Sequence, residues 1–346
     1  MLKKNKINLL LANHKSISIS RFINLSLYEN NRGYYKTKKV GEDFITSPQI
    51  SQMFGECIAI FFSSFQINNF KKINFLELGP GNGFLLRDLI RSIYQIKKEK
   101  INYYFWEKSK FLQKSFFDDL KNIAKIFKLK KFTLKKEPYY FICNEFFDAL
   151  PINQFEKEND NYYEKRIIFK NGKFYIKRKK INSFSNNLSN LKNGDVLEIS
   201  PLSNLYLNKI FNHIITFGGG IIIFDYGPFI KTKTDTLQAI RNKKKCNFLE
   251  HPYEADITYH IDFQDIKQKA TNLGLKVYGP ISQKKFLFYN GINERFISLV
   301  KNCNSNEKKK IIESHFHKLT DPQGMGDLIK CIYVSGSKLN LSYFNE

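Results

Sequence analysis

Three glycines at alternating positions, Gly79, Gly81 and Gly83, separate an apolar segment of the chain from an amphipathic one. Residues 73–78 have the length and composition of a buried strand, and residues 84–96 have the periodicity of a helix. Glycine lets the backbone turn sharply and approach a ligand closely, because it has no Cβ. The helix that follows directs its N-terminal amides toward that ligand. The sequence therefore predicts a nucleotide-type binding loop within an α/β fold.

Predicted strands and helices alternate along most of the chain. We predict further strands at residues 102–106, 139–143, 220–225, 275–278 and 328–335. We predict helices at residues 17–28, after Ser47 as the N-cap with Pro48 in the first turn, from Leu112 through Ile123 to Phe127, and at residues 202–217, 262–273 and 293–317. This alternation is typical of a parallel sheet with right-handed crossovers.

Two segments interrupt the alternation. Residues 155–180 are predicted to form a hairpin with Asn171-Gly172 as its turn, and residues 229–262 are polar and loop-like. The predicted fold class is therefore α/β, with a Rossmann-like, mostly parallel sheet flanked by helices, an N-terminal helical segment, and inserted hairpin and loop subdomains. We expect an N-terminal helical segment (1–70), the first half of a cofactor-binding core (71–152), an inserted hairpin region (153–200), a core helix and strand (201–228), a substrate-side insertion (229–262) and the C-terminal part of the core (263–346).

Acidic residues accompany the glycine loop. The dinucleotide-binding fingerprint requires a third glycine at the position of Phe84, whereas the order Glu77, Gly79, Gly81, Gly83 is similar to the start of adenosylmethionine-dependent methyltransferases. Glu107 ends the second predicted strand, where a carboxylate can accept hydrogen bonds from both ribose hydroxyls. The alternatives are a glycine-rich turn without a ligand and a solvated glutamate.

Asn144, Glu145 and Asp148 follow the strand at residues 139–143, at the sheet edge that lines the ligand crevice of open α/β folds. Glu145 and Asp148 flank Phe146 and Phe147, and carboxylates beside aromatic faces suit a guanidinium group. The alternative is that the phenylalanines belong to the core and the acids to a helix N-terminus.

Further polar residues are candidate substrate contacts. Asp225 ends another strand at the same edge, and Asp256 and His260 lie in the polar insertion, where alternate positions share one side of an extended segment. A surface loop explains the insertion equally well. A single histidine in this pattern does not predict a metal site.

The net charge of +24 allows a nucleic-acid partner, but the basic runs, including residues 177–180 and 243–245, are short and scattered. The abundance of Lys, Asn, Ile, Phe and Tyr is what an AT-rich genome encodes, so we expect no stable nucleic-acid complex. The five cysteines form no paired motif, which indicates a reducing compartment. No apolar run approaches the length of about 20 residues that spans a bilayer, so we expect no membrane insertion.

The first 21 residues contain no acid and resemble a mitochondrial presequence superficially, although a helix fits them as well. We expect a bacterial cytoplasmic protein, with the mitochondrial matrix as the alternative.

Several longer strings resemble the MidA family of class I methyltransferases. They are Gly41-Glu-Asp-Phe-Ile-Thr-Ser-Pro48, Gln52-Met-Phe-Gly-Glu56, Glu77-Leu-Gly-Pro-Gly-Asn-Gly83, Asn144-Glu-Phe-Phe-Asp-Ala-Leu-Pro151, Asp225-Tyr-Gly227, Asp235-Thr-Leu-Gln-Ala-Ile-Arg241, Glu254-Ala-Asp-Ile-Thr258 with His260 and Asp262, and Met325-Gly326. This family includes the mitochondrial arginine methyltransferase that helps to assemble respiratory complex I.

The resemblance implies a class I methyltransferase fold, S-adenosyl-L-methionine (SAM) as cofactor, and a protein arginine as substrate, possible targets being a subunit of complex I type or another protein. It implies that Gly79, Gly81, Gly83 and Glu107 hold the cofactor and that Glu145 and Asp148 are acids of the substrate site. Together with the reasoning above, we expect a cofactor site at Glu77, Gly79, Gly81, Gly83 and Glu107, catalytic roles for Asn144, Glu145 and Asp148, and substrate contacts at Phe146, Asp225, Asp256 and His260. Gln49 stands where the family usually has Glu, which leaves a catalytic role for that position open.

We therefore expect methyl transfer to an arginine nitrogen. A non-catalytic assembly chaperone that binds SAM and a nucleic-acid N-methyltransferase are the alternatives. The sequence leaves the target arginine, the symmetry of the product and the oligomeric state undetermined. It also predicts that the cleft holding Glu145 and Asp148 is locally negative on a globally positive protein.

Overall fold

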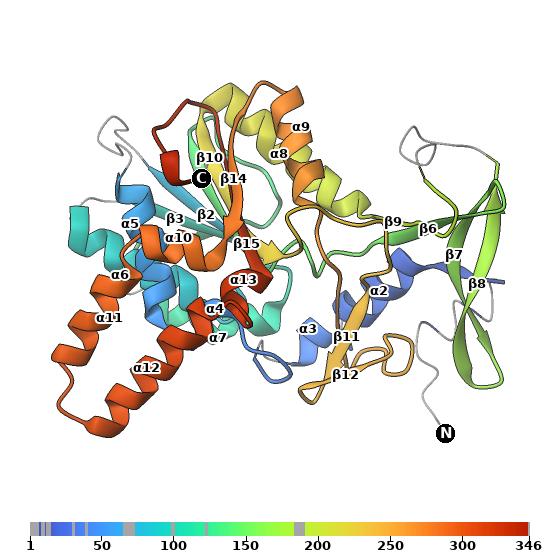
Figure 1. The fold of residues 1–346 in the computed structure, drawn as a ribbon, viewed down its shortest axis with the longest axis horizontal. Helices are drawn as coiled ribbons and strands as arrows, with labels where there is room; N and C mark the ends of the chain where they lie inside the picture. Colours follow the sequence, from blue (N-terminus) through green and yellow to red (C-terminus); the bar gives the residue numbers. More distant parts are fainter. Residues whose placement is uncertain are drawn as a thin grey trace.

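The chain is built around one seven-stranded sheet (Figure 1). The computed structural model describes residues 7, 11, 15–29, 32–38, 41–64, 73–97, 101–121, 124–182 and 191–344. The sheet consists of β2 (Asn74–Leu78), β3 (Asn102–Trp106), β4 (Ile126–Lys128), β5 (Tyr139–Asn144), β10 (Gly219–Tyr226), β14 (Lys276–Ser282) and β15 (Ile329–Ser335), in the spatial order β14-β15-β10-β5-β2-β3-β4.

The five strands β10, β5, β2, β3 and β4 are parallel, and β15 runs antiparallel between β10 and β14. All five residues of β2 are buried, as expected of a strand covered on both faces. The carboxyl ends of β2, β3, β5 and β10 consequently meet at one edge. The mostly parallel sheet flanked by helices confirms the predicted fold class.

Helices cover both faces of this sheet (Figure 1). One face packs against a cluster that includes residues of α5 (Gln52–Ser64), α6 (Phe84–Lys97), α7 (Lys110–Leu120) and α10 (Gln283–Tyr289). The other packs against a cluster that includes residues of α2 (Ile19–Tyr28), α8 (Pro201–Phe217) and α9 (Phe263–Asn272). The remaining helical segments are α3 (Tyr34–Thr37), α4 (Ser47–Ile50), α11 (Ile292–Lys301), α12 (Asn306–Thr320), α13 (Met325–Leu328) and the 3-10 turn η2 (Ser342–Phe344).

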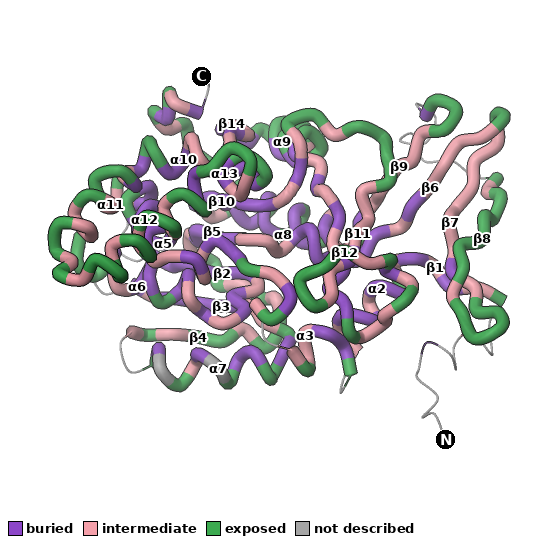
Figure 2. The backbone as a smooth tube through the Cα atoms, turned by 60° about the horizontal axis from the view of Figure 1, so that its bottom comes forward, coloured by how far each residue is buried: buried purple, intermediate pink, exposed green. Residues whose placement is uncertain are grey.

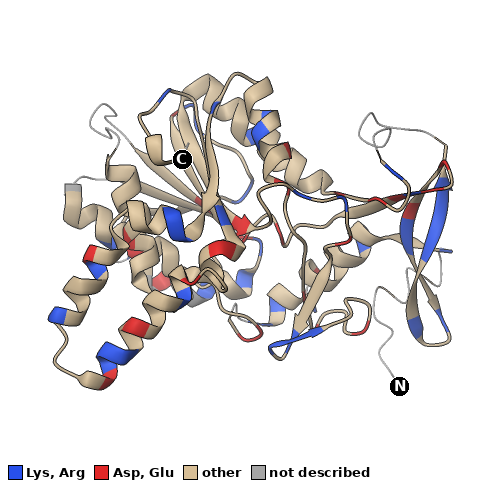
Figure 3. Ribbon diagram, in the orientation of Figure 1, with Lys and Arg blue, Asp and Glu red and all other residues tan. Residues whose placement is uncertain are grey.

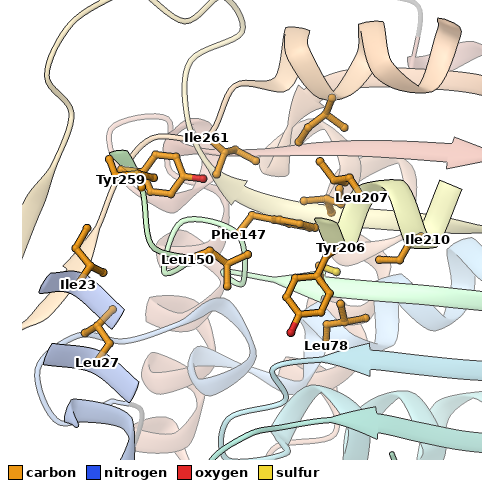
Figure 4. Packing of buried hydrophobic residues seen from close by; sticks show 14 of the residues in the cluster. Ile23, Leu27, Leu78, Phe147, Leu150, Tyr206, Leu207, Ile210, Tyr259 and Ile261 are labelled. Atoms are coloured by element: carbon orange, nitrogen blue, oxygen red, sulfur yellow. The ribbon is translucent and has the colours of Figure 1, made fainter. Parts of the chain in front are cut away.

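The cluster that contains α2, α8 and α9 extends beyond the sheet (Figure 4). Leu78 of β2 and Leu207 of α8 belong to the same buried cluster as Ile23 of α2 and Ile261. The N-terminal helix and the segment after residue 255 are thus packed onto the sheet through continuous apolar contact. This packing places the N-terminal segments beside the carboxyl edge of the sheet.

Two smaller sheets occupy the interruptions. The first contains β1 (Ile17–Ser18), β6 (Asn153–Glu158), β7 (Asn161–Lys170), β8 (Lys173–Ile181) and β9 (Val196–Ile199). The predicted turn at Asn171-Gly172 joins β7 to β8, with positive φ at both residues. The second consists of β11 (Gln238–Arg241), β12 (Lys244–Cys246) and β13 (Asp256–Thr258), so residues 229–262, expected to be loop-like, contain three short strands between loops.

Three local predictions were wrong. Phe127 lies in β4 instead of a helix, because α7 ends at Leu120 and residues 126–128 pair with β3; Ile123 lies outside the described residues. The helix start near Pro48 is capped by Thr46, whose backbone N–H donates to the Gln49 side chain. Residues 293–317 form parts of two helices, since Ser305 caps a new helix.

Most of the N-terminal stretch compared with a mitochondrial presequence, residues 1–21, lies outside the described residues. The end of this stretch belongs to helix α2, which runs from residue 19 to residue 28. Ser18 caps α2 by accepting a hydrogen bond from the Arg21 backbone N–H. The predicted helix at 17–28 is therefore confirmed apart from its first two residues.

Candidate active site

A pocket opens at the carboxyl ends of β2, β3 and β5. It brings together most of the residues that the sequence pattern singles out. Its walls are formed by Tyr28, Tyr35, Phe44, Thr46, Pro48, Gln49, Glu77, Gly79, Pro80, Gly81, Asn82, Phe84, Leu85, Trp106, Glu107, Lys108, Ser109, Leu112, Asn144, Glu145, Phe146, Ala149, Leu150, Leu202 and Tyr206. Chain segments more than 100 residues apart thus share one cavity.

The glycine loop adopts backbone conformations that disfavour other residues. Gly79, Gly81 and Gly83 have φ values of +67°, +56° and +75°. A Cβ at Gly79 would lie 2.8 Å from Phe146 Cδ2, and one at Gly83 would lie 2.5 Å from the Phe116 side chain. Gly79 and Gly81 border the pocket without a Cβ, beside Pro80 and Asn82, which fits the close approach of a ligand to the backbone at the two glycines.

Two carboxylates at neighbouring strand ends lie in this pocket. Glu77 is buried, and its Oε2 has no hydrogen-bond partner among the described residues. Burial and the nearby Glu107 carboxylate raise the pKa of Glu77 to about 8. Burial also raises the pKa of Glu107. Hydrogen bonds from backbone N–H groups lower it in part, and one of them runs from the Ser109 N–H to Glu107 Oε1 at 2.7 Å.

These features fit SAM. A buried carboxylate oxygen without a partner suits the cationic amino-acid portion, a glycine loop admits a close ligand, and Glu107 is placed to accept ribose hydroxyls. Of the predicted cofactor residues, Glu77, Gly79, Gly81 and Glu107 line the pocket and would hold the cofactor there, whereas Gly83 does not line it and packs against Phe116. Trp106, Leu112 and Tyr206 add apolar surface.

The raised pKa of Glu77 has a consequence for stability. In the unfolded chain the carboxyl ionises near its ordinary pKa of 4.5, whereas in the folded cofactor-free protein it holds its proton up to about pH 8. The native state then binds more protons, so this group's contribution to folding stability falls as pH rises from about 5 to 8. We expect Glu77→Gln to gain stability relative to the wild type across that window, by at least about 1 kcal/mol. Urea unfolding at several pH values measures this, with exposed Glu250→Gln as the control; a difference independent of pH would contradict it.

Glu145 occupies the pocket beside the glycine loop. Its φ is +49°, a left-handed conformation that is uncommon outside glycine. Its backbone N–H donates to the Phe224 carbonyl oxygen at 2.8 Å, and the Asn144 amide donates to Oε1 at 3.1 Å. Burial and the Asp225 carboxylate raise the pKa of Glu145 to about 8. The Asn144 carbonyl oxygen Oδ1 has no partner among the described residues.

Asp148 and Asp225 lie behind this pocket wall instead of lining it. Asp225 is fully buried, and its Oδ2 accepts backbone hydrogen bonds from Phe147 at 2.9 Å and Asp148 at 3.4 Å. Burial raises the pKa of Asp225 to about 7, and burial with the neighbouring Asp225 charge raises that of Asp148 well above its ordinary value. This geometry makes Asp225 a support for the loop that presents Glu145.

The two candidate residues of the insertion, Asp256 and His260, lie at different places relative to the pocket. Asp256 is buried and does not line the pocket, but it accepts a hydrogen bond of 2.6 Å from the hydroxyl of Tyr35, which does. His260 lies outside the pocket, where burial and the Lys231 charge lower its pKa. Phe146 lies in the wall, with its ring 5.5 Å from Tyr206. The structure therefore unites Glu145 and Phe146 with the cofactor residues, but leaves His260 apart.

Sequence reasoning missed an aromatic part of the wall. Tyr28 and Tyr35 stack with ring centroids 5.6 Å apart, and the Tyr28 hydroxyl donates to the Ala149 carbonyl oxygen at 2.8 Å. Trp106 donates from Nε1 to the Tyr206 hydroxyl at 2.9 Å. No periodicity marks these residues as pocket-lining, because α2 and α3 reach the pocket only through tertiary packing.

The described part of the chain contains no group of three or more His, Cys, Asp or Glu side chains arranged to hold a metal ion. No helix in it combines the length and apolar character needed to cross a bilayer.

Comparison with known proteins identifies the family. A family model described as S-adenosyl-L-methionine-dependent methyltransferase matches residues 55–281. The mitochondrial protein arginine methyltransferase NDUFAF7 homolog of Caenorhabditis elegans is 30% identical over 329 residues, covering 85% of this chain and 77% of the relative. The human mitochondrial protein arginine methyltransferase NDUFAF7 is 26% identical, covering 90% and 78%.

A solved structure agrees in fold. The crystal structure of a superfamily member from Burkholderia thailandensis bound to S-adenosyl-homocysteine covers 98% of this chain and 93% of its own, with a TM-score of 0.83 and 20% identity. The family match spans more than half of the chain and includes the glycine loop, Glu107 and Glu145. The chain belongs to the family of S-adenosyl-L-methionine-dependent methyltransferases, and SAM is its cofactor.

Proposed function

We propose that this methyltransferase acts on an arginine nitrogen of a protein. The observation that carries the proposal is the Glu145 carboxylate, which lines the cofactor pocket between the Asn144 amide and the Phe146 ring. A carboxylate beside aromatic surface matches a guanidinium group, which forms a planar fork of hydrogen bonds and stacks on rings.

Bound SAM supplies an electrophilic methyl group. A guanidinium is a poor nucleophile because its pKa exceeds about 12. Ionised Glu145 would accept hydrogen bonds from one side of the guanidinium, localise positive charge there, and orient another nitrogen for in-line displacement. The chain contributes positioning and electrostatics, and Asn144 restricts the direction of the carboxylate.

The charge around the site supports a cationic substrate. Glu77, Glu107 and Glu145 line the pocket, while Asp148 and Asp225 lie directly behind its wall. Figure 3 shows Lys and Arg gathered on the β7–β8 hairpin and both signs of charge on the outer helices. The carboxyl groups at the site would bind a cationic side chain once they are ionised, which for Glu145 in the cofactor-free protein means a pH near or above 8.

The substrate class is also supported by the relatives, whose names describe protein arginine methyltransferases. If this chain has the same activity, its substrate is a protein, and a complex I-type subunit is one candidate. The five cysteines are free thiols, which suits a reducing compartment. We propose the bacterial cytoplasm, with the mitochondrial matrix as the alternative, since the names of the relatives describe mitochondrial proteins.

The test is methyl transfer from methyl-labelled SAM into lysate of a strain that lacks this gene. Mass spectrometry should find new methylation on arginine, and proteinase treatment should remove the label from the macromolecular fraction. Label in nuclease-sensitive material would instead support a nucleic-acid methyltransferase. SAM binding without any transfer would support the non-catalytic chaperone.

A further inference from the structure

The β7–β8 hairpin extends at one end of the molecule, away from the pocket edge of the main sheet (Figure 1). β8 pairs with β7 over its whole length, from Lys173 opposite Lys170 to Ile181 opposite Tyr162. Among the described residues no strand pairs with the other side of β8. Within the described ranges, its outer row of backbone N–H and C=O groups is therefore unpaired and could join another strand.

Positive charge is concentrated on this hairpin (Figure 3). Residues 161–181 contain eight Lys or Arg residues and one acid, Glu164, so a short segment carries a large part of the net charge of +24. The sequence shows residues 177–180 as a short isolated run. Strand pairing instead places that run beside Arg166 and Lys165, which makes it a clustered surface.

Some of these charges are neutralised within the protein. Arg166 binds both oxygens of Glu164 at 2.9 and 3.0 Å, and Arg178 lies 3.1 Å from Glu156. Lys165 lies 3.1 Å from Asp235.

Three lysines on one face of β8 differ from these residues because no described acid pairs with them. Lys173, Lys177 and Lys179 are exposed and form no ion pair with any described residue. Figure 2 colours most of β8 as exposed. Alternate residues of a strand share a face, so Lys177 and Lys179 lie about 6.7 Å apart along it.

Lysines on an edge strand prevent pairing with another copy of the same edge, because like charges would face one another. They leave pairing open to a strand of opposite charge. The opposite face of β8 carries Phe174 and Ile176 in the first half of the strand, with Ile176 40% exposed, and Arg178 and Lys180 in the second half. A complementary strand would thus place acidic residues opposite the lysines and apolar residues opposite Phe174 and Ile176.

We propose that β8 is a docking strand for an extended acidic segment of a partner protein, which joins the sheet by main-chain hydrogen bonds and pairs its carboxylates with Lys173, Lys177 and Lys179. Main-chain bonds supply affinity in such strand addition, and alternate side chains supply specificity. The acidic segment is recognised by its charge pattern and extended form. This docking is independent of the chemistry at Glu145.

The experiment uses the full-length protein and a fluorescein-labelled peptide of five Glu-Val repeats, followed by fluorescence anisotropy. We expect saturable binding that weakens with added salt. Lys177→Glu combined with Lys179→Glu should weaken it by about tenfold or more, since two attractive cross-strand pairs become repulsive. Lys209→Glu combined with Lys267→Glu, an equal charge change on exposed helical lysines, should leave binding unchanged.

Further arms separate strand addition from simple charge attraction. A peptide of five Glu-Pro repeats has the same charge but lacks half of the backbone donors, and should bind at least about tenfold more weakly. Equal binding of the two peptides, equal loss in both double variants, or no binding of the Glu-Val peptide would overturn the proposal. So would tighter, hairpin-dependent binding of a 20-nucleotide uridine RNA or of phosphatidylserine vesicles. Retained S-adenosyl-homocysteine binding shows that the hairpin variant is folded.

Discussion

Replacing Glu145 with glutamine is expected to reduce methyl transfer by at least about a hundredfold while leaving cofactor binding intact. The substitution keeps the shape of the side chain but removes the negative charge that would orient a guanidinium. The backbone bond from Glu145 to the Phe224 carbonyl does not depend on the side chain, so the loop should keep its conformation. Turnover is measured with methyl-labelled SAM and cofactor affinity by calorimetry.

The pH dependence gives this prediction a second measurement. The pKa of Glu145 is raised to about 8 in the cofactor-free protein, so the carboxyl is neutral below that pH and charged above it. In the wild type kcat/KM, which reports the free enzyme, should therefore increase as pH rises toward and through 8. This increase should be reduced in Glu145→Gln and preserved in exposed Glu250→Gln. Wild-type turnover in the Glu145 variant would eliminate the proposed role, and loss of cofactor affinity would reassign Glu145 to cofactor binding.

Replacing Gly81 with valine should weaken cofactor binding by at least about a hundredfold, or ~2.7 kcal/mol. Gly81 lines the pocket with φ +56°, so the new side chain costs backbone strain and occupies space where the cofactor must approach. Calorimetry with S-adenosyl-homocysteine measures the loss.

Gly172→Val is the matched control. Gly172 has φ +78° in the hairpin turn, and a Cβ there meets no atom within 4 Å. It should therefore show a similar strain of about 1–3 kcal/mol in unfolding experiments but unchanged cofactor affinity. If Gly172→Val lost cofactor binding as well, the effect of Gly81→Val would be attributable to destabilisation instead of to the loop.

The core of the fold follows from local patterns in the sequence. Strand β3 was predicted at its observed bounds, and the glycine loop, Glu107 and Glu145 meet in one pocket because parallel strands place their carboxyl ends together. The helix predicted through Phe127 failed because β4 is a short edge strand whose pairing with β3 outweighs its local helical pattern.

Residues that act through distant partners were harder to assign. Asp225 was expected at the substrate, yet it is fully buried and binds backbone amides across 77 or more residues of sequence. Tyr35 lines the pocket and bonds to Asp256, a contact between residues 221 positions apart. Neither arrangement has a local sequence signature, since both depend on how the insertions fold back onto the sheet.

The hydrogen bonds of Asp225 have a consequence for substitutions in the Glu145 loop. They go to backbone N–H groups of residues 147 and 148, which every amino acid except proline possesses. A substitution at either position leaves these hydrogen bonds in place unless the new residue is proline, so the carboxylate at the end of β10 constrains the loop more than either side chain's own polarity does. The Phe147 ring is buried in the core, so replacements there must still fill the same space.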